Sequence, residues 1–147
     1  MKTGMLIVVV MVSVWCAGCA QSGYQVIKPA EYADTHQMFD LTFGWKKTVT
    51  EHGLTIDGYV RNNRYFIISD MDMTVSVLDS SGREKSREDF LFIPSRLPMD
   101  NFARFSVALK ARPLAGDKIR FLYRYDALDG RDGALTWRNS FEVPVAE

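Results

Sequence analysis

Two cysteines, Cys16 and Cys19, stand three positions apart and are the only thiols of the sequence. This spacing fits three kinds of chemistry: half of a metal site, a redox-active pair, or a processing site in a secreted chain. A redox pair needs a helix N-terminus in a strand-helix-strand setting, and a zinc site needs two further ligands at matched spacing. The surrounding sequence provides neither context, which favours the processing site.

The residues before Cys19 have the pattern of a secretion signal. A basic residue near the N-terminus precedes an apolar run over residues 5–15, and small residues close it. The sequence Ala17-Gly18-Cys19 resembles the lipobox of bacterial lipoproteins. The resemblance implies that residues 1–18 are a signal peptide and that Cys19 is acylated through its sulfur, with palmitate or a similar fatty acid, before the signal is removed.

Two other interpretations of this segment stay open. Secretory cleavage after Ala20 would use Gly18 and Ala20 as the small pair, and the uncharged stretch 4–20 is at the lower length limit of a spanning helix, about 17 residues. All three interpretations export the domain. Because Ala20 follows the cysteine in place of aspartate, the resemblance to sorted lipoproteins implies the outer membrane of a Gram-negative cell, facing the periplasm. The lipid on Cys19 would make the membrane a partner.

The composition of the chain indicates a globular domain after the signal. The chain has 147 residues, of which 47% are hydrophobic, so we expect one such domain with a packed core. The formal net charge is zero, which does not indicate nucleic acid as a partner. Once the signal has been removed at Cys19, no free thiol remains for catalysis or metal binding, and no cofactor is expected.

Residues 19–40 show no sustained periodicity and predict a lipid-anchored tether, whereas residues 41–147 alternate between apolar and polar positions with a period of two. The strands that this alternation predicts are 41–49, 54–61, 71–77, 90–93, 104–111, 118–125 and 135–143. Seven short strands separated by turn residues are typical of two antiparallel sheets packed face to face. We therefore predict an all-β, Ig-like sandwich, with a closed barrel as the alternative. The register predicts that Val75, Val77, Phe105, Phe121 and Tyr123 point into the core.

Three segments resemble the FxLYD-type bacterial Ig-like domains. They are 58–63 (GYVRNN), 73–82 (MTVSVLDSSG) and 105–109 (FSVAL), within a stretch of about 41–125. Only Asp79 of the motif that names the family is retained. The resemblance implies the sandwich fold and carries no catalytic residues over to this chain.

The residues that could support catalysis or metal binding are few. His36 and His52 would have to serve any hydrolase, and no nucleophile motif accompanies them, so a hydrolase is the distant alternative. Two acidic sets are the remaining candidates: Asp70 and Asp72, placed on one strand face as in a glycosidase, and Asp126, Asp129 and Asp132, which crowd one loop as calcium ligands would. Solvent-facing strand and hairpin positions explain both sets, and we assign no catalytic residue and no metal site.

Basic residues fall on the polar faces of the predicted strands. They are Arg104, Lys110, Lys118, Arg120 and Arg124. Such a row could meet an anionic surface or an acidic partner, and Tyr59 and Leu122, large residues on otherwise polar faces, could form its apolar centre. The sequence thus predicts a lipid-anchored, non-catalytic recognition module that binds an envelope protein or polymer. A periplasmic module for a ligand or an anionic surface is the alternative.

Overall fold

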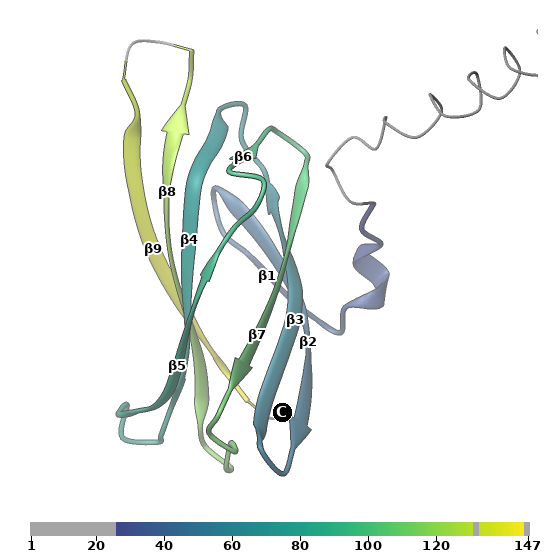
Figure 1. The fold of residues 1–147 in the computed structure, drawn as a ribbon, viewed down its shortest axis with the longest axis vertical. Coiled ribbons are helices and arrows are strands. Elements are labelled where there is room, and N and C mark those ends of the chain that lie inside the picture. The colour runs from purple at the N-terminus through teal and green to yellow at the C-terminus, as the bar shows by residue number, and fades with distance from the viewer. Residues whose placement is uncertain (1–25, 131–132, 146–147) are drawn as a thin grey trace, which may run out of the picture.

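The computed structural model describes residues 26–130 and 133–145, and within these the chain forms an antiparallel β-sandwich (Figure 1). The elements in chain order are a 3₁₀ helix η1 (Pro29–Glu31) and the strands β1 (Asp34–Gln37), β2 (Leu41–Thr50), β3 (Gly53–Asn62), β4 (Ile67–Leu78), β5 (Glu84–Leu91), β6 (Arg96–Leu97), β7 (Phe102–Leu109), β8 (Lys118–Leu128) and β9 (Leu135–Pro144). The signal peptide 1–18, Cys16 and Cys19 lie outside the described residues.

The strands form two sheets that face each other. Sheet A has the order β1-β2-β3-β7, and sheet B has the order β5-β4-β8-β9 with the short β6 paired to β4. The connections from β3 to β4 and from β7 to β8 cross between the sheets, as in Ig-like sandwiches. The predicted fold class, an all-β antiparallel sandwich, is confirmed.

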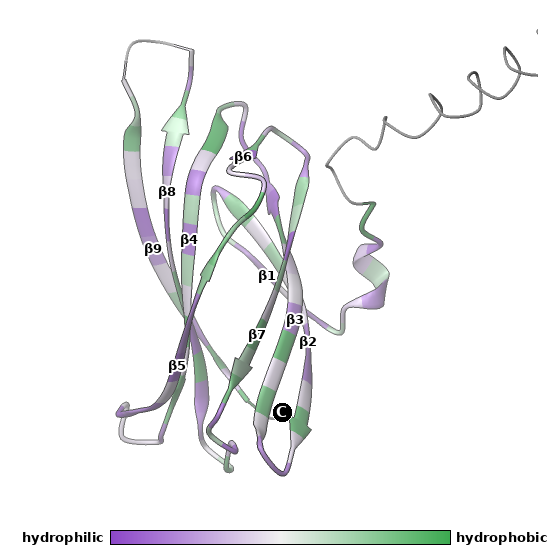
Figure 2. Ribbon diagram, viewed as in Figure 1, coloured by the Kyte–Doolittle hydropathy of each residue, from purple (hydrophilic) through white to green (hydrophobic). Residues whose placement is uncertain are grey.

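The predicted register is confirmed as well, because the five residues expected in the core are buried. Val75, Val77, Phe121 and Tyr123 are fully enclosed, and Phe105 is 3% exposed. Apolar and polar residues alternate along the strands in Figure 2. Phe121 lies at the centre of this core, with its ring stacked on Phe141 at a centroid distance of 4.9 Å.

Two short strands, β1 and β6, account for the difference between the seven strands expected and the nine found in the described part of the chain. β5 begins at Glu84, well before the predicted range 90–93, and its first residues are charged and exposed. β1 is a four-residue strand of polar residues, and β6 has two residues. Edge strands carry polar side chains on both faces without losing their main-chain hydrogen bonds to one neighbour, so a period-two apolar pattern does not mark them.

The sandwich also begins earlier than the predicted boundary at residue 41. β1 pairs with β2 inside the range 19–40 that was expected to be a tether, and Asp40 is buried. Before β1, the strap, defined here as residues 26–33, crosses the outer face of sheet A. Arg104 Nη2 donates a hydrogen bond of 3.1 Å to the carbonyl oxygen of Val26, and Ile27 is 7% exposed. From residue 26 onward the expected tether therefore belongs to the folded domain.

Candidate functional site

A cavity opens at the end of the sandwich that carries the β3–β4 turn and the β8–β9 hairpin. Figure 1 shows these two connections at the same end of the molecule. The volume of the cavity is about 630 Å³. The walls come from the β1–β2 connection, the β3–β4 turn and the hairpin. The side chains that line it include Phe39, Arg64, Tyr65, Phe66, Leu135 and Trp137. We call this cavity the hairpin pocket.

The pocket exists because sheet B continues past the cover that sheet A provides. Alternate residues of β9 point toward the sandwich interior, and the one nearest the middle of the core, Phe141, is packed there. Trp137 and Leu135 point to the same side of β9 as Phe141 but lie nearer the hairpin. Sheet A does not cover them there, and they are 44% and 69% exposed. Tyr65 and Phe39, from the facing loops, are 72% and 71% exposed. Exposed apolar side chains gathered around one cavity are typical of a binding site, whereas single ones need no explanation.

Asn62 shapes the β3–β4 turn, which supplies Arg64, Tyr65 and Phe66 to the pocket. Its side chain is fully buried and donates hydrogen bonds to the carbonyl oxygens of Phe66 and Leu97, at 2.8 and 3.0 Å. Its Oδ1 accepts a hydrogen bond of 2.8 Å from the backbone N–H of Arg64. These three bonds fix the turn 63–66, so the pocket wall is preformed.

Arg64 brings a positive charge to this apolar wall. Its guanidinium carbon lies 4.0 Å from the centroid of the Phe39 ring, a cation–π arrangement. Its Nε is buried and has no hydrogen-bond partner among the described residues. Arg138, on the outer face of β9, has no carboxylate within ion-pair distance in the described parts of the chain. Both cations are therefore available to an acidic ligand.

A buried carboxylate lies beneath the pocket. Asp40 is 5% exposed and accepts hydrogen bonds from the phenol groups of Tyr123 and Tyr125, at 3.0 and 2.7 Å. Burial and the neighbouring Asp40 carboxylate raise the pKa of both tyrosines far above its usual range. The Tyr125 ring in turn stacks on Phe66 at 6.2 Å, so this network holds the floor of the pocket in place.

The structure divides the predicted basic row between two opposite faces. Arg104 lies on the outer face of sheet A, whereas Lys118, Arg120 and Arg124 lie on sheet B, and Lys110 is exposed just past the end of β7. The prediction of a single basic face is wrong, because successive strands of the sandwich fall in different sheets.

The three β8 residues of this row are also paired with acidic neighbours. Lys118 meets Glu142 at 3.3 Å, and Arg120 meets Glu84 at 3.4 Å. Arg124 donates two hydrogen bonds to Oδ2 of Asp72, at 2.8 and 2.6 Å, and the Asp72 carboxylate raises the pKa of this guanidinium. The outer face of β8 therefore carries balanced charge.

Tyr59 and Leu122 do not form a common patch, since they lie in different sheets. Tyr59 is 3% exposed because Tyr32 of the strap packs edge-on against it at 4.9 Å and Phe102 at 5.4 Å. Its ring lies across Gly44, where an added Cβ would stand 2.3 Å from the ring. Leu122 is half-buried on the outer face of sheet B. Tyr59 thus holds the strap on the domain.

The other predicted candidates are scattered. His36 lies in β1 with its ring stacked on Phe141 at 4.2 Å, and His52 lies in the exposed β2–β3 turn. A β-bulge separates Asp70, which has a φ of 50°, from Asp72. Among the described residues no group of three or more His, Cys, Asp or Glu side chains could hold a metal ion. Asp132 lies outside the described residues.

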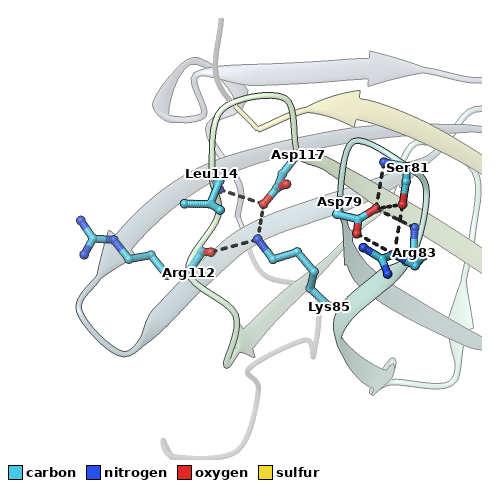
Figure 3. Close-up of polar contacts among 7 residues, drawn as sticks. All are labelled: Asp79, Ser81, Arg83, Lys85, Arg112, Leu114 and Asp117. Atoms are coloured by element: carbon cyan, nitrogen blue, oxygen red, sulfur yellow. Dashed lines mark hydrogen bonds and ion pairs between the residues drawn. The ribbon is translucent and has the colours of Figure 1, made fainter.

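Figure 3 shows a second polar network, at the end of the sandwich opposite the hairpin pocket. Asp117, which is 4% exposed, accepts hydrogen bonds from Lys85 Nζ at 2.6 Å and from the backbone N–H of Leu114 at 2.8 Å. These bonds lower the pKa of Asp117. Nearby, Asp79 accepts from Ser81 and Arg83, which hold its pKa well below the usual range. Both networks brace loops, the β7–β8 and β4–β5 connections.

Comparisons with known proteins add little to this geometry. No protein-family model matches the chain, and no curated protein matches its sequence. Among solved structures, the chain is similar to the yeast GGA1 GAE domain, with 12% sequence identity and a TM-score of 0.44 over 74% of this chain and 96% of that one. No helix in the described residues is long and apolar enough to cross a membrane.

Proposed function

We propose that the protein is a lipid-anchored, non-catalytic recognition module of the cell envelope that binds a protein partner through the hairpin pocket. The observation that carries the proposal is the cluster of exposed apolar side chains around that cavity. Tyr65, Phe39, Leu135 and Trp137 are between 44% and 72% exposed and line one volume of about 630 Å³. Such side chains dominate the energetics of protein interfaces because they bury large areas on binding.

The rigidity of the pocket supports the same function. Its walls are held by the buried Asn62 and its floor by the Asp40–Tyr125 contact. A preformed site avoids the entropy cost of ordering a loop when the partner binds. A sandwich that holds such a site at one end suits recognition better than a flexible chain does.

The anchor belongs to the proposal on the strength of its sequence. An apolar run and small residues precede Cys19, and the first described residues, the strap, join the outer face of sheet A. A lipid on Cys19 would place the domain at the outer membrane, facing the periplasm, with little free chain between the anchor and the fold.

The anchor is tested by Cys19→Ser, with radiolabelled fatty acid fed to cells that produce either protein. We expect the label on the original chain only, and release of the variant from the membrane or retention of its unprocessed precursor. Label that persisted on the variant would contradict acylation of Cys19.

The pocket is tested by site-specific photo-crosslinking in the same cells. A crosslinking amino acid at Tyr65 should capture a defined protein, and Trp137→Ala should weaken the capture because it removes apolar surface from the pocket. Leu114, which is 65% exposed at the opposite end of the sandwich, is the matched control position. Equal capture at Tyr65 and Leu114, unaffected by Trp137→Ala, would contradict recognition at this end.

A further inference from the structure

The backbone of β9 has one free edge, and hydrogen bonds identify which residues face it. Val145, which continues the β9 register, donates its N–H to the carbonyl oxygen of Asp117 at 3.1 Å, so odd-numbered residues of β9 bond toward β8. Even-numbered residues then point their N–H and C=O groups away from β8, because the two kinds of pair alternate in an antiparallel ladder. Ser140 fits this alternation, since its N–H donates to Oδ1 of its neighbour Asn139 at 2.8 Å.

Two of the outward positions in the C-terminal half of this edge lack a free N–H, whereas both outward positions beside the pocket keep theirs. The N–H of Ser140 is occupied by Asn139, and Pro144 has no N–H to offer. Thr136 and Arg138 keep outward N–H and C=O groups with no backbone partner among the described residues. An unpaired strand edge is a template for a further strand.

The open segment, residues 136–138, and the hairpin pocket are continuous. Trp137 lies between Thr136 and Arg138 in sequence, and its side chain lines the pocket. A strand paired with Thr136 and Arg138 would point alternate side chains toward the same interior face, where Trp137 and Leu135 stand. An apolar side chain on that strand would enter the pocket.

The charges beside this edge indicate the chemistry of the occupant. Arg138 faces outward from the open segment, and Arg64 stands in the pocket wall; neither has an acidic partner among the described residues. The residues that flank the apolar one on an added strand would lie on the same face as Arg138, where opposite charges on paired strands attract. A second copy of β9 would bring another Arg138 to this edge, and the one carboxylate that it carries, Glu142, is already paired with Lys118 at 3.3 Å.

We infer that the partner binds as an extended peptide that adds a strand to the β9 edge, with an apolar side chain in the hairpin pocket and acidic residues on either side of it. This inference rests on the proposed function and adds the mode of binding and the peptide chemistry. Main-chain hydrogen bonds to Thr136 and Arg138 supply affinity, and the pocket selects the side chain.

A library of random peptides selected against the full chain in detergent solution tests the inference. We expect selected peptides to carry an aromatic or branched apolar residue flanked by Asp or Glu. Binding of one such peptide should slow amide hydrogen exchange at Thr136 and Arg138 by about tenfold or more, since each outward N–H becomes bonded. The amide of Ser140, already bonded to Asn139, is the internal reference.

Two variants at residue 136 distinguish the contribution of its backbone N–H to binding from that of its side chain. Thr136→Pro removes an outward donor and should weaken binding by about tenfold, the equivalent of one main-chain hydrogen bond at the upper end of its range, while Thr136→Val keeps the N–H and should bind as the original chain does. The exchange measurement uses the unmodified chain and stays decisive if the proline variant fails to fold.

The possible outcomes are distinct. Peptides that require Trp137 but bind Thr136→Pro equally well, without protecting the two amides, would overturn strand addition and leave pocket recognition standing. A library that yields no peptide preferring the original chain over Trp137→Ala would overturn both proposals. A dimer in sedimentation that Thr136→Pro dissociates would assign the edge to a second copy and overturn the inferred partner.

Discussion

The phenol of Tyr125 donates a hydrogen bond of 2.7 Å to Oδ2 of Asp40, and both groups are almost completely removed from solvent. Asp40 comes from sheet A's β1–β2 connection and Tyr125 from β8 of sheet B. The bond therefore ties the two sheets together directly beneath the hairpin pocket. A buried carboxylate is tolerated only where donors satisfy it, and here Tyr123 provides the second one.

Removing one of these donors should destabilise the domain. Tyr125→Phe leaves the buried Asp40 carboxylate one hydrogen bond short, and we expect the free energy of unfolding to fall by about 1.5–3 kcal/mol, as for bonds to charged groups. Urea unfolding followed by tryptophan fluorescence measures the change. Tyr65→Phe, at an exposed position, is the control and should change stability by less than about 0.5 kcal/mol. Equal effects would mean that Asp40 is satisfied without Tyr125.

The centre of the core gives a second prediction. Phe121 is fully buried and touches rings from both sheets, including Phe141 at 4.9 Å and Trp45 at 5.1 Å. Phe121→Ala should lower the free energy of unfolding by about 3 to 5 kcal/mol through lost burial and the cavity that remains. Leu114→Ala, which truncates an exposed side chain, should leave the unfolding midpoint nearly unchanged.

Gly44 should tolerate no side chain while Tyr59 is present. A Cβ at this position would overlap the Tyr59 ring, which in turn holds Tyr32 of the strap. We expect Gly44→Ala to cost about 1–3 kcal/mol, as overpacking does. In a Tyr59→Ser background the same change should cost much less, and a double-mutant cycle measures the difference. A cost that stayed constant would place the strain in the backbone of β2 instead.

Acid should weaken the end of the sandwich opposite the pocket. Lys85 and the Leu114 N–H lower the folded-state pKa of Asp117 below the value of about 3.9 that an unfolded aspartate has. The unfolded state then binds the proton more readily, so this contribution is present above about pH 4 and is lost as the pH falls through the folded pKa. In Asp117→Asn, the free energy of unfolding should decrease less between neutral and acidic pH than it does in the original chain. Urea titration at each pH measures this difference. Leu114→Ala, which keeps the backbone N–H that Asp117 accepts and removes only an exposed side chain, should leave the slope unchanged.

The strands whose one face is buried could be predicted from sequence because burial imposes a period of two. Val75 and Val77 on β4 and Phe121 and Tyr123 on β8 follow this rule, and their predicted orientation is correct. β5 carries no such period over most of its length, since it is an edge strand with charged residues from Glu84 onward.

The pocket could not be predicted, because no local pattern encodes where one sheet ends and the other continues. In the alternating pattern of β9, Trp137 occupies a position that should face the core. It is exposed because sheet A ends before it can cover this position. Its companions Phe39 and Tyr65 come from distant loops. Two adjacent asparagines, Asn62 and Asn63, indicate a turn, but nothing in the pair distinguishes the residue that organises the wall from its half-buried neighbour.

The pairing of β4 with β8 has a consequence for how the chain matures. Val75 finds its neighbour Phe121 only after the intervening strands have been made, and β3 of sheet A likewise waits for β7, where Ile56 meets Val107. Such non-local contacts make folding slow compared with helical domains of similar size. A ribosome-bound fragment that ends before β8 contains the strands of sheet A but lacks the central and edge strands β8 and β9 of sheet B, so the sandwich cannot close. We propose that this chain is exported. Slow folding would then keep it unfolded until it reaches a translocation channel, which requires an unfolded chain.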